Sequence, residues 1–342
     1  SFKKITTGIT DIYSKIKSGL TKRGSVTERI RNLSTFFVDD VLGNFNSKLI
    51  YNNTFGKLAR SYETYKAKVA KIEALVDGAN SLLNSDGKRL AKFLGISRNA
   101  LVKKKYKLRM LQLQREHQSN TVDGKPNAKA PSAMAFINAT VKSIVKGEIL
   151  SQQDADVLNE LKAEFEVDGE INLEKLEQSL TAKEKKALAL YDEANGSLSS
   201  EAEFISANLH GNKINLLNDY NHHAVLQSKD GDTSTILDKL KRFQNLLSTK
   251  SGTIVERTNG AKPISFDPGY SATRGAQETF LDYEMTQSMR EVDGTINELE
   301  TQMENEGTKD SLKGVRALKS AKDEIVRVIF KSSFSDMSRK CA

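Results

Sequence analysis

Cysteine and proline are scarce in this chain of 342 residues, tryptophan is absent, and these gaps exclude whole classes of structure. The single cysteine, Cys341, rules out a disulfide framework and a cysteine-rich metal site. Only 4 prolines interrupt the sequence, so long helices meet few of the residues that end them. No run approaches the roughly 18 consecutive apolar residues of a transmembrane helix, and the sequence therefore predicts no membrane span.

The composition favours helices with narrow apolar seams. Hydrophobic residues make up 38% of the chain and charged residues 28%, which is a low apolar share for a thick globular core. We therefore predict an all-α, elongated fold of long, coiled-coil-like helices and short capped helices. One minor β-hairpin is expected at Asn259-Gly260, a dipeptide typical of tight turns, between residues 253–255 and 263–266.

The strongest pattern is a seam in which large or apolar residues alternate steps of three and four, as in coiled coils. Its members are Phe55, Leu58, Tyr62, Tyr65, Val69, Ile72, Val76, Ala79 and Leu83. The partner helix lies either in this chain or in another copy. A second seam in the C-terminal region comprises Met285, Met289, Val292, Ile296, Leu299 and Met303. Methionine suits an interface that rearranges, and plain core filling is the alternative.

Helix-start signals and turn residues divide the chain. Thr181 with Glu184, and Ser200 with Glu203, form capping boxes that predict two helix starts, and Ser151 predicts another. The predicted regions are a basic arm at 1–24, a basic long-helix region at 25–119, a linker at 120–131, a short-helix region at 132–247, a loop or hairpin at 248–270 and C-terminal long helices at 271–342.

Charge is distributed unevenly along the chain. Residues 1–120 contain 24 Lys and Arg against 9 Asp and Glu, whereas the remainder contains 28 against 35. One interpretation is that the basic third contacts a polyanion. The other is that the basic and acidic parts attract each other within an oligomer.

The densest basic cluster lies on a predicted helix over residues 97–116, with Tyr106 among the cations. Its cations are Lys103, Lys104, Lys105, Lys107 and Arg109. Such a helix suits non-specific contact with nucleic-acid phosphates and stacking of a base on the tyrosine. A solvated face, or one paired with a protein partner, is the alternative.

No motif for catalysis is present: the sequence has no phosphate-binding glycine loop, nucleophile elbow or His-Glu-x-x-His. We therefore predict no enzymatic activity, no cofactor and no metal site. The most localised polar cluster is Tyr220-Asn221-His222-His223. Adjacent histidines on a helix point about 100° apart and chelate a metal poorly, which leaves a pH-sensitive contact or hydrogen-bonded packing.

Residues from about 132 to 300 resemble segments of the very long polyproteins that tailed bacteriophages, including crAss-like phages, package in the virion and eject into the host. The resemblance rests on short capped helices, on residues 218–223, on Phe266-Asp267-Pro268-Gly269-Tyr270 and on the Arg274 to Tyr283 segment. It implies a helical, non-catalytic chain that is threaded through a tail.

The resulting expectation is a structural or cargo protein in the interior of a phage head or tail, delivered to the host with the genome. Its partners are other virion proteins or copies of itself, joined through helical seams, with non-specific contact to DNA. The alternatives are a non-specific nucleic-acid-binding module, which would be cytoplasmic, and an accessory helical segment of a virion polymerase polyprotein.

Overall fold

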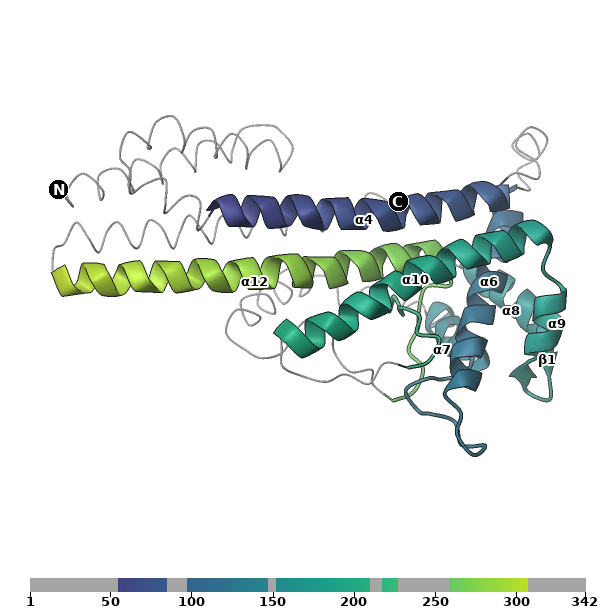
Figure 1. The fold of residues 1–342 in the computed structure, drawn as a ribbon. Helices are drawn as coiled ribbons and strands as arrows, with labels where there is room; N and C mark the ends of the chain where they lie inside the picture. The colour runs from purple at the N-terminus through teal and green to yellow at the C-terminus, as the bar shows by residue number, and fades with distance from the viewer. Residues whose placement is uncertain (1–54, 85–96, 147–151, 210–216, 227–258, 307–342) are drawn as a thin grey trace. The chain divides into compact units, whose positions relative to one another are not determined.

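The structure is a computed structural model that describes residues 55–84, 97–146, 152–209, 217–226 and 259–306 (Figure 1). Within these ranges it contains seven helices and one two-stranded sheet, which confirms the all-α prediction with a minor β-hairpin. The helices are α4 (Phe55–Asn84), α6 (Ser97–Ser119), α7 (Ala133–Val145), α8 (Gln152–Phe165), α9 (Leu173–Gln178), α10 (Ala182–Leu209) and α12 (Pro268–Glu306).

The described residues belong to two compact units. The first unit includes residues 55–67 and 281–306, and the second includes the described residues between 68 and 226 together with 259–280. Helices α4 and α12 each contribute one part to the first unit and one to the second. None of the described helices combines the length and apolar character that crossing a bilayer requires.

The seam on α4 is buried at every position from Tyr62 to Leu83, as its three-four spacing predicts. In the second unit its partners lie in the same chain. The Leu190 side chain of α10 lies against Gly78, and Tyr191 donates a hydrogen bond to Asn80 Oδ1 over 3.0 Å. The start of α12 packs there too, because a Cβ on Gly269 would lie 2.7 Å from Val76 Cγ1.

In the first unit, α4 and α12 run antiparallel. Lys57 Nζ lies 2.5 Å from Glu291 Oε2, and the hydroxyls of Ser61 and Ser288 share a hydrogen bond. From the first contact to the second, the residue number rises on α4 and falls on α12, which shows that the two helices run in opposite directions. The side chains of Phe55 and Leu58, and those of the second predicted seam at Met285, Met289, Val292, Ile296, Leu299 and Met303, lie outside the described residues.

Helix α6 is the centre of the second unit, packed against α7, α8, α9 and α10. Every residue from Leu108 to Gln114 is buried, so this stretch is covered on all sides. Residues 120–131, predicted as a linker, form a loop with left-handed backbone at Asp123 (φ 51) and Gly124 (φ 70). The two helices that this loop joins, α6 and α7, pack against each other.

The β-hairpin occurs at a different place from the predicted one. Strand β1 (Glu166–Val167) pairs antiparallel with β2 (Glu170–Ile171), in the register Glu166 to Ile171 and Val167 to Glu170. The turn residues Asp168 (φ 52) and Gly169 (φ 83) are both left-handed, as a two-residue hairpin turn of type I′ requires. The sequence analysis expected a hairpin only at Asn259-Gly260 and did not anticipate these two short strands.

The predicted strand at 263–266 has another partner. Ile264 forms a β-bridge with Val225, and the backbone N–H of Ser265 donates to Ala224 O over 2.9 Å. Residues 253–255, its expected partner, lie outside the described residues. The 263–266 segment therefore connects the start of α12 to the segment that follows α10.

Two helix-start predictions had opposite outcomes. The Thr181–Glu184 capping box forms: the Thr181 N–H donates to Glu184 Oε2 over 2.8 Å, and the Glu184 N–H to Thr181 Oγ1 over 3.3 Å. The second prediction is wrong, because α10 continues through Ser200 to Leu209. There Ser200 Oγ donates to the carbonyl of Gly196, which is how serine is accommodated inside a helix.

Candidate functional site

The first two cations of the predicted nucleic-acid cluster contact groups of this chain. Lys103 Nζ lies 2.6 Å from Glu160 Oε1 and 3.1 Å from Glu164 Oε2, both on α8. Lys104 Nζ donates to the carbonyl of Leu83, near the end of α4, over 3.4 Å. These contacts join α6 to two helices that are remote from each other in sequence.

The next two lysines reach more buried partners. Lys105 Nζ lies 2.8 Å from Asp267 Oδ2. The other oxygen of Asp267 accepts the N–H groups of Gly269 and Tyr270 and so caps α12. Lys107 Nζ lies 2.9 Å from Glu184 Oε1, a carboxylate that is 3% exposed. One lysine therefore connects α6 to the α12 cap and the other connects it to the α10 capping box.

The electrostatics of these pairs follow from their surroundings. The hydrogen bond to Glu160 outweighs burial and raises the pKa of Lys103 above its ordinary value. Burial alone would raise the pKa of Glu184, but hydrogen bonds from Thr181 and Lys107 outweigh it and hold that pKa below its ordinary value. Both shifts favour the charged form of the group concerned, Lys103 in one pair and Glu184 in the other.

The two remaining members of the predicted cluster have partners within the protein. Arg109 is fully buried, and the half-buried Tyr106 packs its ring against Phe266 at a centroid distance of 5.9 Å. Partial burial also raises the pKa of Tyr106. In this arrangement the Arg109 guanidinium does not reach a phosphate, and the ring of Tyr106 contacts Phe266. Nucleic-acid contact through these residues stays a prediction that would require the second unit to open.

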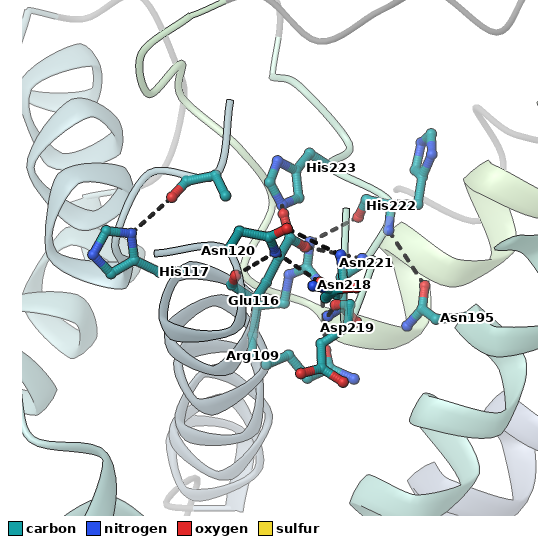
Figure 2. Close-up of polar contacts among 12 residues, drawn as sticks. Arg109, Glu116, His117, Asn120, Asn195, Asn218, Asp219, Asn221, His222 and His223 are labelled. Atoms are coloured by element: carbon teal, nitrogen blue, oxygen red, sulfur yellow. Dashed lines mark hydrogen bonds and ion pairs between the residues drawn. The ribbon is translucent and has the colours of Figure 1, made fainter. Parts of the chain in front are cut away.

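Arg109 begins a line of polar side chains along one face of α6, shown in Figure 2. Its Nη2 donates to the backbone carbonyl of His222 over 2.7 Å, and its Nη1 donates to Gln112 Oε1 over 3.2 Å. Gln112 Nε2 in turn donates to Asp192 Oδ1 over 2.7 Å. The line continues with Glu116 and Asn120, and we call Arg109, Gln112, Glu116 and Asn120 the α6 polar ladder.

Glu116 is the most constrained member of the α6 polar ladder. It is 1% exposed, and its Oε2 accepts the backbone N–H of Asn221 over 2.9 Å. Its Oε1 lies 3.5 Å from His223 Nε2. The His223 ring meets Phe136 of α7 edge-on at 4.7 Å between centroids. A buried carboxylate therefore fixes both the backbone and a side chain of the 217–226 segment.

Ser119 at the end of α6 and Asn120 directly after it hold the start of the same segment. Asn120 Nδ2 donates to the carbonyl of Asn218 over 2.9 Å, and Asn120 Oδ1 accepts the Asn218 N–H over 3.0 Å. Ser119 Oγ donates to Asp219, which has left-handed backbone (φ 49). These reciprocal bonds replace the secondary structure that residues 217–223 lack.

His222 and His223 contact different carboxylates. The ring atom His222 Nε2 lies 3.9 Å from Glu278 Oε2 on α12. The backbone N–H of His222 donates to Asn195 Oδ1 on α10 over 3.4 Å. The His222 ring also packs on Gly275, where an added Cβ would lie 2.7 Å from its Cγ. Of the interpretations of Tyr220–His223, hydrogen-bonded packing is the one that this geometry fits directly.

Sequence reasoning located the 220–223 cluster but missed its partner. Gln112, Glu116 and Asn120 gave no signal as a site, since they appear in sequence as ordinary polar residues of an exposed helix face. Their spacing of four, together with Arg109 three residues before Gln112, does place all four on one face.

Comparisons with protein-family models, with curated proteins and with solved structures found no match to this chain.

Proposed function

We propose that this chain is a non-catalytic structural or cargo protein of a tailed-phage particle, packaged inside the head or tail and delivered to the host with the genome. The observation that carries the proposal is that the polar side chains of α6 contact other groups of the same chain. In the second unit, the basic side chains of α6 pair with carboxylates of α8, α10 and the α12 cap, and the α6 polar ladder binds a backbone segment. The proposal assigns these groups to assembly of the chain.

The motifs behind the phage resemblance support it, because they are packing motifs here. Residues 218–223 lie along the α6 polar ladder. Asp267 caps α12 and pairs with Lys105, and Pro268 occupies the first helical position, where its missing N–H costs nothing. A family of non-catalytic internal proteins would keep such residues for folding.

The helical construction also suits passage through a narrow tail. Long helices without disulfides open in stages, since each contains many local hydrogen bonds and few non-local ones. Ion pairs between neighbouring helices fix how the helices align in the folded state. They separate without breaking covalent bonds. We place the chain in the virion interior on this reasoning.

Quantitative mass spectrometry of purified particles and of newly infected cells tests the proposal. Peptides from this chain should be present in particles before infection. They should appear inside host cells within the time that DNA entry takes, with protein synthesis blocked. Peptides that occur only in cells with active synthesis, and never in particles, would refute the cargo role.

A further inference from the structure

An acidic groove lies between the C-terminal half of α6, the β1–β2 hairpin and α9. It has a volume of about 770 Å³. Its lining includes Gln114, His117, Thr121, Val167, Leu173 and four acidic residues. All of these lie in the second unit.

The carboxylates of the groove are poorly neutralised. They are Asp168, Glu170, Glu174 and Glu177. Glu177 pairs with Arg115 at 2.6 Å. Glu170 and Glu174 accept only neutral donors among the described residues, from Ser132 Oγ at 3.3 Å and Gln178 Nε2 at 3.0 Å. Asp168 has no side-chain partner within the described ranges. The groove therefore keeps a surplus of negative charge, whereas Lys103, Lys105 and Lys107 of α6 each meet a carboxylate.

A buried amide provides a second, independent feature. Gln114 is 3% exposed, and its Oε1 accepts the backbone N–H of Ala133 over 3.1 Å. Its Nε2 has no hydrogen-bond partner among the described residues, although it lines the groove. A ligand that brings a carbonyl into the groove can therefore accept a hydrogen bond from this amide.

His117 fixes a third contact of defined polarity. Its Nδ1 lies 2.7 Å from the carbonyl oxygen of Ala130. A carbonyl only accepts hydrogen bonds, so Nδ1 carries the hydrogen and Nε2 of the neutral ring is an acceptor. The groove thus combines an unpaired donor at Gln114, an acceptor at His117 and a surplus of carboxylates.

We propose that this groove binds an extended lysine- or arginine-rich peptide segment of a partner protein. The cationic side chains meet Glu170, Glu174 and Asp168. A backbone carbonyl of the peptide accepts from Gln114 Nε2, and a backbone N–H donates to His117 Nε2. Val167 and Leu173 supply apolar surface for the aliphatic stems of the cationic side chains.

Other cations fit this groove less well. A polyamine has donors only and leaves Gln114 Nε2 unpaired. The described residues contain no group of three or more His, Cys, Asp or Glu arranged to hold a metal ion. A peptide alone matches the carboxylates, the amide donor and the imidazole acceptor together. Peptide binding by this groove does not depend on the proposed phage role, and purified protein is enough to test it.

The experiment measures fluorescence anisotropy of an end-blocked eight-residue peptide that alternates lysine with alanine, titrated with the full chain at low salt. A peptide with glutamate in place of lysine is the negative probe, and spermine is the competitor. The double variant Glu170→Gln/Glu174→Gln should weaken lysine-peptide binding about 10-fold. The control Glu193→Gln/Glu203→Gln, at exposed α10 positions, should leave binding within about 2-fold.

Gln114→Glu separates hydrogen bonding from charge. It keeps the acceptor for Ala133, removes the donor and adds a negative charge. Our proposal expects weaker peptide binding in this variant, checked for folding by circular dichroism, and unchanged or tighter spermine binding. His117→Phe, which removes the acceptor, repeats the test if Gln114→Glu does not fold. Absence of peptide binding to the parent, equal loss in the α10 control, or tighter peptide binding to Gln114→Glu would each overturn the proposal.

Discussion

Helix α6 and the part of α4 from Lys68 onward both belong to the second unit, but they differ in what they bury. On α4 the buried positions follow the three-four spacing of Val69, Ile72 and Val76, and the residues between them are exposed or half-buried. On α6 seven consecutive residues are buried, and Arg109, Gln112 and Gln114 are among them. Helix α4 is therefore buried along one stripe, whereas α6 is buried on all sides from Leu108 to Gln114.

The difference concerns how each helix obtains specificity. Apolar side chains on a stripe contribute free energy through area removed from water, and they tolerate small shifts. Buried polar groups tolerate none, because a group that loses its partner carries the full desolvation cost. We therefore expect α4 to contribute mainly stability and α6 mainly the position of residues 217–223.

The largest effect should come from charging the α4 stripe. Val69→Asp with Ile72→Asp buries two carboxylates without partners, at several kcal/mol each, which is comparable with the whole stability of a domain. The expected result is loss of cooperative thermal unfolding, measured by circular dichroism. The matched control is Ala70→Asp with Ala74→Asp, at exposed positions of the same helix. A normal melting curve for the first double variant would show that the stripe is not buried.

The next effect should come from Glu116 in the α6 polar ladder. Glu116→Leu removes the oxygen that accepts the Asn221 N–H and the carboxylate beside the His223 ring, and it should cost about 3–4 kcal/mol in urea unfolding. Glu116→Gln keeps an oxygen for Asn221 and should cost about half as much. Hydrogen exchange at the Asn221 amide should accelerate more in the leucine variant. Equal costs in the two variants would contradict the role of this bond.

A smaller contrast separates two lysines on the same helix. Lys107→Gln should destabilise the second unit by about 2 kcal/mol, because Glu184 is buried. Lys103→Gln should cost less than about 0.5 kcal/mol, because Glu160 is 61% exposed and water screens that pair. Urea unfolding of both variants measures the contrast. Equal losses would show that burial does not set the strength of these ion pairs.

The smallest effect is a pH dependence at Glu184. Its folded-state pKa is lowered from 4.5, so the stability that it contributes is complete above that value and is lost as pH falls through the lowered pKa. Urea unfolding at a series of pH values between about 6 and 3 should therefore show a steeper acid loss in the parent than in Glu184→Gln. Parallel curves would mean that the lowered pKa has no energetic consequence.

Sequence reasoning succeeded where structure depends on local pattern. The α4 stripe and the Thr181–Glu184 capping box are set by spacing within one helix, and both were predicted. It failed where a distant segment decides the outcome. Arg109 and Lys107 appear in sequence as a solvated basic face, and only the folded chain brings His222 and Glu184 to them. Ser200 was predicted to start a helix because it forms a capping-box pattern with Glu203, but it lies inside α10 and donates to the Gly196 carbonyl instead.

The charge asymmetry shows the same limit. The excess of cations before residue 120 suggested a polyanion or the acidic part of another copy. In the second unit, Lys68, Lys103, Lys105 and Lys107 instead pair with acidic residues of the same chain that lie beyond residue 120. Sequence gives the imbalance, but only tertiary structure shows which carboxylates meet which cations.

Our central proposal is that the role of the α6 lysines is to assemble the second unit, in place of the predicted contact with nucleic acid. The salt dependence of duplex-DNA affinity, compared between the parent and the Lys103→Gln/Lys104→Gln/Lys105→Gln/Lys107→Gln variant, tests it most directly. The account predicts the same logarithmic slope for both proteins, or no binding by either. A slope that shrinks by roughly 3–4 units in the variant would contradict it, because that is the loss expected when four phosphate contacts disappear.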